Sequence, residues 1–507
     1  MRLREEGGGR RGRRLGWDGV RLTVLSLSFG ACSGASSDPA AEGAGRYPQL
    51  EPCERGEGLC GQLEVPLDPA SPEGATLNLA VRVQPARAPL AEPEALYVLV
   101  GGPGQAATEV GPMMAPLLDR VADKRDIVFV DQRGTGRAGK PASLACELDS
   151  ARLADFFDTD FPTDDLRACL AAYDLDTRYF TTENSVADLE VARKHFGHQR
   201  IHLYGASYGT RLALSYLRRH PEPVVTAVLD GVAPPSISLL SAMDRGAHEM
   251  LERTFADCEA APACAQAFPR LRERFDAWRS GHREVGAQLA AEHPRTGARE
   301  SVEIKTDAVM SVLRSAIYSP EVAALIPLAL ERLMAGNADP LVGLAGMGES
   351  MGGTISLGLF ISIVCAEDMR HVDAKELAWA RENTRFGTRM HDEISELCVF
   401  WPVGEVPADH AEPVRAETPT LLLSGALDPA TPARWGDLAA RTLAHAHHIV
   451  VPGVGHNTSM TGCVPELIED FVESGGFGPI ERSCVEGRSR PPFFVSEAGP
   501  VVGGKAR

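Results

Sequence analysis

Short, almost uninterrupted runs of apolar residues place the strongest constraint on how this chain can fold. Each run is followed by glycine or aspartate, and such runs are typical of parallel strands buried on both faces of a sheet. They lie at residues 95–100, 127–130, 201–204 and 227–229. Helical patterns separate some of them, for example at residues 186–196. This alternation predicts an α/β fold with a mostly parallel central sheet.

The middle of the chain predicts a helical subdomain inserted into that sheet. After Pro235 the pattern becomes mostly helical, and strand patterns return only near residues 419–424 and 448–451. A chain of 507 residues can hold one large core with an insertion as easily as two separate domains. We expect a core in two parts, with a helical lid between them. The expected bounds are 51–238 for the first part, 239–412 for the lid, 413–487 for the second part and 488–507 for a tail.

The first residues have the pattern of an export signal. Six arginines lie within the first 14 residues, ahead of an apolar run at residues 22–31. That run is too short to span a membrane permanently, and its charged beginning is typical of a segment that is removed after export. We therefore expect residues 1–31 to be an export signal and residues 32–50 to be a flexible tether.

The end of this signal resembles the cleavage box of a bacterial lipoprotein. Small residues precede Cys32, although Phe29 departs from the usual leucine. We expect Cys32 to be lipidated, so that the lipid is the chain's only attachment to a membrane. Ordinary cleavage near Ala31 or Ala35 is the alternative. The expected location is the cell envelope or, without the lipid, the exterior.

The cysteines support an oxidising compartment. The chain has eleven, and ten remain when Cys32 is set aside as the lipid site, an even number suited to disulfides. Buried free thiols are the alternative for several of them. Proximity in the sequence suggests the pairs Cys53 with Cys60, Cys146 with Cys169, Cys258 with Cys264, Cys365 with Cys398, and Cys463 with Cys484.

Charge and motif content argue against several classes of partner. The formal net charge of −18 disfavours nucleic acid, because binding to phosphates normally needs a clustered basic face. The histidines and cysteines show no CxxC or HExxH spacing, and no glycine motif ends in the Lys-Ser/Thr of a phosphate-binding loop. We expect a monomer with no metal and no cofactor.

The sequence Gly205-Ala206-Ser207-Tyr208-Gly209 lies between a strand pattern and a helical pattern. In that context G-x-S-x-G predicts a sharp turn that exposes a strained serine at a helix N-terminus, where the dipole favours developing negative charge. The glycines let strand and helix approach closely. Ser207 is thus the predicted nucleophile. A glycine-rich turn without chemistry is the alternative.

A serine needs a base, and the base needs a group that orients it. In enzymes that use this turn, the acid and then the histidine follow the serine in the chain. Asp428 and His456 each come shortly after a predicted strand, in that order. Alone, Asp428 could form an Asx turn before Pro429 and His456 could be an ordinary loop residue. Their joint placement predicts a Ser207–His456–Asp428 triad.

Acyl transfer also needs donors for an oxyanion. The stretch Gly101-Gly102-Pro103-Gly104 follows a predicted buried strand, so its amides can point into the site. We expect the amides of Gly102 and Tyr208 to form the oxyanion hole, with Gly101 in reserve. A plain glycine turn is the alternative.

Together with Asp131-Gln132-Arg133-Gly134-Thr135-Gly136, these motifs resemble the proline iminopeptidase and tripeptidyl aminopeptidase family of α/β-hydrolases. The resemblance spans roughly residues 53–484. Many proline iminopeptidases have histidine before the double glycine, where this chain has Val100, and this favours the tripeptidyl aminopeptidase branch. The resemblance implies the α/β-hydrolase fold, a peptide substrate cleaved near its N-terminus, and a lid that blocks internal cleavage.

The resemblance also implies acidic side chains that bind the substrate's free ammonium. Glu367 and Asp368 are the candidates, and a structural acidic pair beside a disulfide is the alternative. We expect Asp131, Arg133 and Asp188 to stabilise loops instead, because an arginine held by carboxylates can fix a turn. Two rival functions stay open: a carboxylesterase for small acyl esters, and a non-catalytic surface lipoprotein that binds a ligand.

Overall fold

The computed structural model describes residues 45–54, 58–88, 91–114, 117–136, 143–146, 152–157, 162–352 and 355–501. The predicted export signal, the lipidation site Cys32 and most of the predicted tether lie outside these ranges. Within them, no helix combines the length and the apolar composition needed to cross a membrane.

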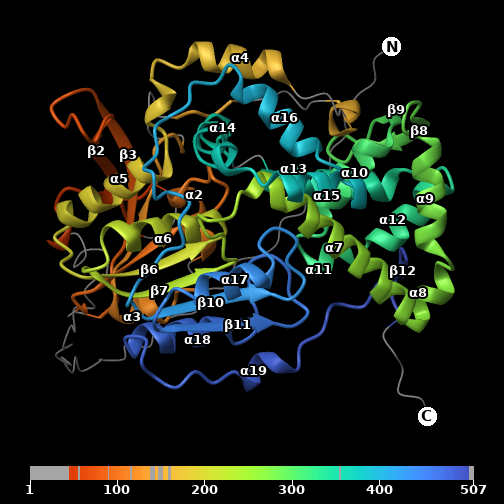
Figure 1. The fold of residues 1–507 in the computed structure, drawn as a ribbon. Helices are drawn as coiled ribbons and strands as arrows, with labels where there is room; N and C mark the ends of the chain where they lie inside the picture. Colours follow the sequence, from red (N-terminus) through yellow and green to blue (C-terminus); the bar gives the residue numbers. More distant parts are fainter. Residues whose placement is uncertain are drawn as a thin grey trace, which may run out of the picture. The chain divides into compact units, whose positions relative to one another are not determined.

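A nine-stranded sheet forms the core, in the order β1-β2-β3-β5-β4-β6-β7-β10-β11. The strands from β5 to β11 pair in parallel, whereas β1, β2 and β3 form an antiparallel edge. The two parts of the core therefore meet in one sheet, because β10 pairs with β7 (Figure 1). The mostly parallel α/β fold predicted from the apolar runs is confirmed. The strands are β1 (Glu51–Pro52), β2 (Leu59–Pro66), β3 (Thr76–Gln84), β4 (Ala95–Leu99), β5 (Ile127–Val130), β6 (Ile201–Ala206), β7 (Val224–Asp230), β10 (Thr420–Gly425) and β11 (Ala446–Val451).

Helices cover both faces of this sheet, which explains why its central strands are apolar throughout. Every residue of β4, β5 and β10 is buried. Successive side chains of β4 enter different cores: Tyr97 and Leu99 pack in one, Leu96 and Val98 in the other. The first core is covered by α5 (Thr182–His195), α6 (Tyr208–Arg219) and α17 (Ala433–Ala440), the second by α2 (Ala107–Met114), α3 (Val121–Lys124) and α18 (Val464–Glu473).

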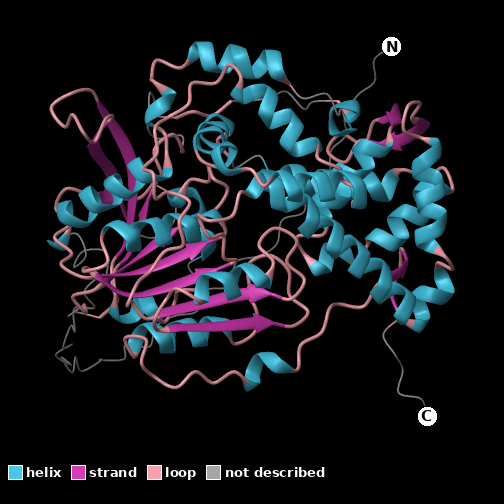
Figure 2. Ribbon diagram, viewed as in Figure 1, coloured by secondary structure: helices cyan, strands magenta, loops and turns pink. Residues whose placement is uncertain are grey.

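The segment between β7 and β10 is mostly helical, as its pattern predicts. Figure 2 shows the arrowheads of the parallel strands pointing towards these helices, so the lid adjoins the carboxyl ends of the strands. One element was not predicted: the hairpin of β8 (Ala287–Glu292) and β9 (Arg299–Ile304), which has no continuous apolar run because much of it is exposed. The lid helices are α7 (Leu239–Ala260), α8 (Pro262–Ala267), α9 (Leu271–Gly281), α10 (Thr306–Ala316), α11 (Pro320–Ala323), α12 (Ile326–Met334), α13 (Asp339–Gly352), α14 (Leu357–Ala366), α15 (Ala374–Asn383) and α16 (Arg389–Cys398).

The C-terminal tail packs on the lid. After α19 (Ser483–Glu486), Arg490 forms an ion pair with Asp257 of α7 at 2.9 Å. Phe493 is buried within the hydrophobic core of the lid, and the Phe494 amide donates to the Ala324 carbonyl at 3.1 Å. The tail ends in a small hairpin of β12 (Phe494–Ser496) and β13 (Gly499–Pro500).

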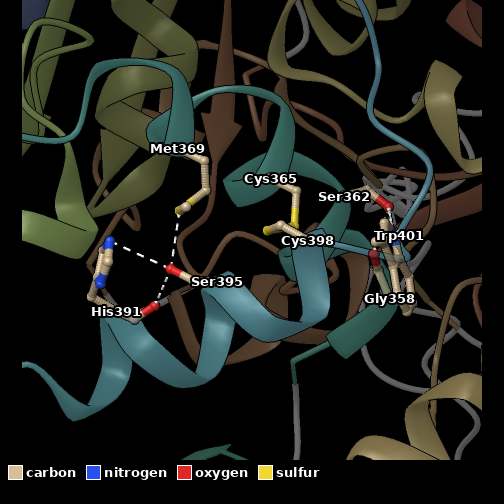
Figure 3. The surroundings of a disulfide bond; sticks show 8 residues. All are labelled: Gly358, Ser362, Cys365, Met369, His391, Ser395, Cys398 and Trp401. Atoms are coloured by element: carbon tan, nitrogen blue, oxygen red, sulfur yellow. Dashed lines mark hydrogen bonds between the residues drawn. A yellow bond between two sulfur atoms is a disulfide. The ribbon is translucent and has the colours of Figure 1, made fainter.

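All five disulfide pairs expected from sequence proximity are formed in the structure. Figure 3 shows Cys365–Cys398, which joins α14 to α16 inside the lid. Close by, the Trp401 indole donates to Ser362 Oγ at 2.9 Å, and the Ser362 hydroxyl donates to the Gly358 carbonyl at 2.7 Å. Covalent and polar contacts thus hold these two helices together.

Candidate active site

Ser207 occupies the turn between β6 and α6 in a strained conformation. Its φ of 56° and ψ of −123° lie outside the regions that ordinary residues prefer. Glycine is required on both sides of Ser207, two residues before it and two residues after it. A Cβ on Gly209 would overlap the Leu99 carbonyl oxygen, and one on Gly205 would lie 2.6 Å from the Gly209 oxygen. The Ser207 side chain makes no capping hydrogen bond to α6, which leaves its hydroxyl available for chemistry.

Asp428 and His456 form the predicted pair. His456 Nδ1 lies 2.8 Å from Asp428 Oδ2, each on a loop that follows a parallel strand. The buried Asp428 carboxylate also accepts hydrogen bonds from the amides of Ala430 and Thr431, at 2.8 and 2.9 Å. Thr431 Oγ1 donates to Asp428 Oδ2 at 2.7 Å and lies 3.2 Å from His456 Nδ1. These contacts fix the orientation of the imidazole.

Electrostatics in this pair favour the charged forms of both residues. Burial alone would lower the pKa of His456, but the charge of Asp428, its hydrogen bond and the charge of Asp230 outweigh burial and raise it. Burial likewise would raise the pKa of Asp428, but His456 and Thr431 lower it. A neutral His456 is therefore a stronger base than free histidine, and its imidazolium is stabilised when it forms.

The end of β7 brings the histidine and serine loops together. The Ser207 amide donates to the Asp230 carbonyl at 2.8 Å. Beside it, a Cβ placed on Gly231 would lie 3.2 Å from His456 Cε1. The serine loop and the histidine loop therefore both lie at the carboxyl end of β7.

The lid also contacts His456. The His456 amide donates to the Tyr318 carbonyl at 2.9 Å, and the two rings meet edge to face with centroids 5.4 Å apart. Tyr318 lies between α10 and α11, far from His456 in sequence. No local motif marks it, so the sequence analysis missed it. Thr431 was missed as well, although Asp-x-x-Thr is a pattern typical of such a turn.

The glycine loop expected to form the oxyanion hole lies against the nucleophile. A Cβ placed on Gly101 would lie 3.0 Å from Ser207 Cβ. The reserve donor, the Gly101 amide, already donates to Gln105 Oε1 at 3.1 Å. Gly102 has a φ of 110°, which favours glycine, and Tyr208 directly follows Ser207. The glycine loop that carries Gly102 thus adjoins Ser207 through Gly101, while Tyr208 belongs to the same turn as the serine.

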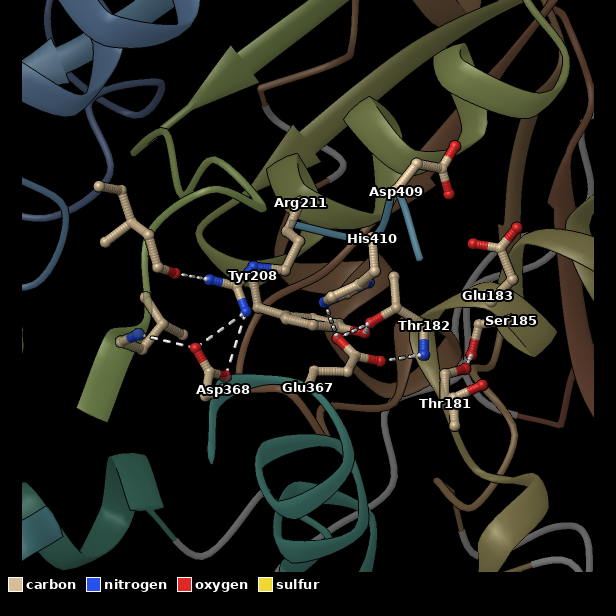
Figure 4. Close-up of polar contacts among 12 residues, drawn as sticks. Thr181, Thr182, Glu183, Ser185, Tyr208, Arg211, Glu367, Asp368, Asp409 and His410 are labelled. Carbon is tan, nitrogen blue, oxygen red and sulfur yellow. Dashed lines mark hydrogen bonds and ion pairs between the residues drawn. The ribbon is translucent and has the colours of Figure 1, made fainter. Parts of the chain in front are cut away.

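Asp368 does not face the site as expected of an ammonium-binding residue. Its side chain is completely buried and lies 3.1 Å from Arg211 Nη1 (Figure 4). It also accepts the Leu239 amide at 2.7 Å, while Arg211 donates to the Ile237 carbonyl at 2.7 Å. The pair joins α6 to the beginning of the lid.

Glu367 is also completely buried, with its oxygens occupied by protein donors. It accepts the Thr182 amide at 2.6 Å and the Thr182 hydroxyl at 2.7 Å, and Thr182 Oγ1 lies 2.6 Å from the Tyr208 hydroxyl (Figure 4). His410 Nε2 lies 3.6 Å away. Burial raises the pKa of Glu367 to about 7. These contacts favour the structural alternative for Glu367 and Asp368, and their binding of a substrate ammonium stays a prediction.

The residues expected to stabilise loops do so in the structure. Arg133 donates to both oxygens of Asp188, at 2.8 and 2.6 Å, and to the carbonyls of Leu67 and Tyr179. Asp131 accepts the Thr108 amide at 2.8 Å. Across the described residues, no group of three or more His, Cys, Asp and Glu side chains has the arrangement of a metal site.

A parallel sheet with a strained serine after one strand and an Asp–His pair after two later strands defines the class of α/β-hydrolases. The chain belongs to the alpha/beta hydrolase fold family, whose sequence model matches residues 94–462. The predicted fold class is thereby confirmed.

Three curated relatives match most of the chain. Serine protease Hip1 of Mycobacterium tuberculosis is 26% identical over 468 residues, covering 85% of this chain and 88% of that protein. Tripeptidyl aminopeptidase of Streptomyces coelicolor is 24% identical over 464 residues, covering 84% and 82%. Carboxylesterase B of Mycobacterium tuberculosis is 26% identical over 515 residues, covering 92% and 96%. The predicted resemblance to the proline iminopeptidase and tripeptidyl aminopeptidase family is confirmed.

Proposed function

We propose that this protein is a serine hydrolase that cleaves peptide amides at the N-terminus of short peptides through an acyl-enzyme. The observation that carries the proposal is the hydrogen bond between Asp428 and His456. It lies near the carboxyl end of β7, where Ser207 is held in its strained turn. A reactive serine needs such a base and such an orienting acid.

In the proposed reaction, His456 accepts the Ser207 proton as Ser207 Oγ attacks the scissile carbonyl. The amides of Gly102 and Tyr208 donate to the resulting oxyanion. His456 then gives the proton to the leaving amine as the C–N bond breaks, and an acyl-enzyme remains. Water, deprotonated by His456, attacks this ester, and the proton returns to Ser207 as the acid product leaves. Asp428 orients the imidazole throughout.

The peptide preference is supported by the relatives named serine protease and tripeptidyl aminopeptidase, which match more than four fifths of the chain. The lid adjoins the carboxyl ends of the strands, and in the proposed enzyme it restricts access to the serine. We propose that this restriction limits cleavage to chain ends. The contacts of Glu367 with Thr182 and of Asp368 with Arg211 favour a structural role for both carboxylates.

Carboxylesterase activity is the second candidate, because a relative named carboxylesterase B matches 92% of the chain. The same triad serves both reactions, and the pocket beneath the lid decides between them. A non-catalytic binding protein is the third candidate.

Labelling and substrate assays separate these candidates. A fluorophosphonate probe should label the wild type but not Ser207→Ala; equal labelling of both would contradict the assignment of the nucleophile. A panel of tripeptidyl and aminoacyl chromogenic amides, measured beside short-chain aryl esters, then divides peptidase from esterase. Each peptide is also tested with its N-terminus acetylated. If acetylation leaves turnover unchanged, cleavage does not depend on a free N-terminus.

We also propose that the protein is an exported monomer, anchored by a lipid on Cys32. Metabolic labelling with an alkynyl fatty acid should mark the wild type and leave Cys32→Ala unmarked. Incorporation into both would show that Cys32 is not the acylated residue. Sedimentation of the purified protein tests the monomer.

A further inference from the structure

Asp230, the last residue of β7, is a buried carboxylate that the proposed triad leaves without a role. Its side chain is 0% exposed. An ionised carboxylate in the protein interior is costly unless donors surround it. Most of its donors come from the loop that carries His456, and the Tyr204 hydroxyl of β6 forms a further hydrogen bond with the carboxylate.

Thr458 and Ser459, which follow His456 by two and three residues, enclose this carboxylate. The Thr458 amide lies 2.9 Å from both oxygens, and the Thr458 hydroxyl donates to Oδ1 at 2.9 Å. The Ser459 amide donates to Oδ2 at 2.9 Å, and the Ser459 hydroxyl donates to the same oxygen. The histidine loop is therefore fastened to the end of β7.

The backbone of Asp230 holds the nucleophile. Its carbonyl accepts the Ser207 amide at 2.8 Å, and Ala206 lies opposite Asp230 in the β6–β7 ladder. One residue thus contacts the serine turn through its carbonyl and the histidine loop through its carboxylate. A shift of either loop would change the Ser207–His456 geometry, to which proton transfer is sensitive.

We propose that Asp230 is a positioning residue for the triad, which fixes the serine and histidine loops relative to each other and whose negative charge stabilises the His456 imidazolium. This inference rests on the proposed function. It adds a second carboxylate to the site, one that does not hydrogen-bond to the imidazole.

The charge of Asp230 gives the proposal a signature in the pH dependence. The titratable groups around the histidine loop are Asp428 after β10, Asp230 on β7, Tyr318 of the lid, and Tyr204 of β6, whose hydroxyl lies 2.6 Å from Ser459 Oγ. Both carboxylates raise the pKa of His456, against burial, which lowers it. Only neutral His456 accepts the serine proton. Loss of the Asp230 charge should therefore move the acid limb of the reaction to lower pH.

The test is the second-order rate of fluorophosphonate labelling, measured against pH for the wild type and Asp230→Asn. The variant should lose at least about tenfold in its plateau rate, because the two loops are less well held. The midpoint of its acid limb should move to lower pH by about half a unit or more. A role limited to fold stability would lower the plateau without moving the midpoint. A folded Asp230→Asn with the wild-type plateau and midpoint overturns the proposal.

A double variant, Thr458→Val with Ser459→Ala, is the matched control. It removes both hydroxyl donors but keeps both carboxylates, so its plateau should fall several-fold while its midpoint stays. A midpoint that moves as in Asp230→Asn would overturn the charge assignment.

If thermal unfolding shows that Asp230→Asn does not fold, the double variant decides: a wild-type plateau rate in the double variant overturns the positioning role. Labelling that persists in Ser207→Ala would refute the proposed function itself. This outcome is independent of the result for Asp230.

Discussion

At the scale of single residues, the hydrogen-bonding partner decides what each buried carboxylate does. Asp428 and Glu367 are both buried, yet one has its pKa lowered by His456 and the other has its pKa raised to about 7. The difference is the partner: Asp428 faces an imidazole, whereas Glu367 faces the neutral donors of Thr182. A charged partner offsets the loss of hydration that neutral donors offset only in part.

Asp428→Asn should lower kcat by about three to four orders of magnitude, because an amide favours the wrong tautomer of His456. The amides of Ala430 and Thr431 keep their acceptor Oδ1 in this variant, and Thr431 Oγ1 can accept from the new amide nitrogen, so its thermal unfolding should stay close to that of the wild type. Steady-state kinetics with the best substrate of the panel measure the effect. A loss of less than about tenfold would mean that another group orients His456.

Glu367→Gln should change how stability depends on pH. Because the pKa of Glu367 is raised in the folded state, the native protein binds this proton more tightly than the unfolded chain does between about pH 4.5 and 7. The wild type should therefore lose about 3 kcal/mol relative to Glu367→Gln as pH rises through this window. Denaturant unfolding at pH 5 and pH 8 measures the change. Glu382→Gln, at an exposed site on α15, is the control and should show no such difference.

At the scale of elements, close approach of strand and helix builds the nucleophile turn. Gly209 lets α6 lie against the end of β4, where the glycine loop begins. The G-x-S-x-G motif is thus required for the close approach of strand and helix as well as for the turn. The same principle operates at Gly455, where a side chain would overlap the Tyr318 carbonyl that binds the His456 amide.

Gly209→Ala should destabilise the protein by at least about 3 kcal/mol and abolish fluorophosphonate labelling, because backbone atoms cannot move aside. Gly343→Ala is the matched control: it lies in α13 at an exposed site, and a Cβ there meets no atom within 4 Å. It should be neutral or stabilise by up to about 1 kcal/mol. Thermal unfolding compares the two variants. Equal behaviour would refute the packing account of the motif.

At the scale of the whole molecule, the lid is held to the core at several points. The Arg211–Asp368 pair joins α6 to the lid, and the Tyr318 carbonyl binds the histidine loop. The C-terminal tail leaves the core and inserts Phe493 into the hydrophobic core of the lid. These contacts place the lid beside the site.

Phe493→Ala should lower stability by about 3–5 kcal/mol, because it opens a cavity in the lid. It should also increase the rate of limited proteolysis, since the tail loses its anchor. Phe477→Ala is the control, because Phe477 is 74% exposed. If both variants unfold and are cleaved alike, the tail does not stabilise the lid.

Local sequence patterns were enough to predict the parallel sheet, the nucleophile turn and the candidates Asp428 and His456. These features depend on local rules: apolar runs give strands, glycines permit the turn, and chain order fixes which loop follows which strand. The disulfides followed as well, because each joins cysteines that are close in sequence.

Which polar side chains face the site could not be predicted from local patterns and became visible in the folded chain. Glu367 and Asp368, which directly follow α14, turn into the interior where they meet Thr182 of α5 and Arg211 of α6, contacts that no local pattern specifies. Tyr318 of the lid and Thr431 of a neighbouring loop contact His456, and Asp230 of the sheet binds the loop that carries it. The surroundings of a side chain depend on long-range packing, and the spacing of residues along the chain does not predict that packing.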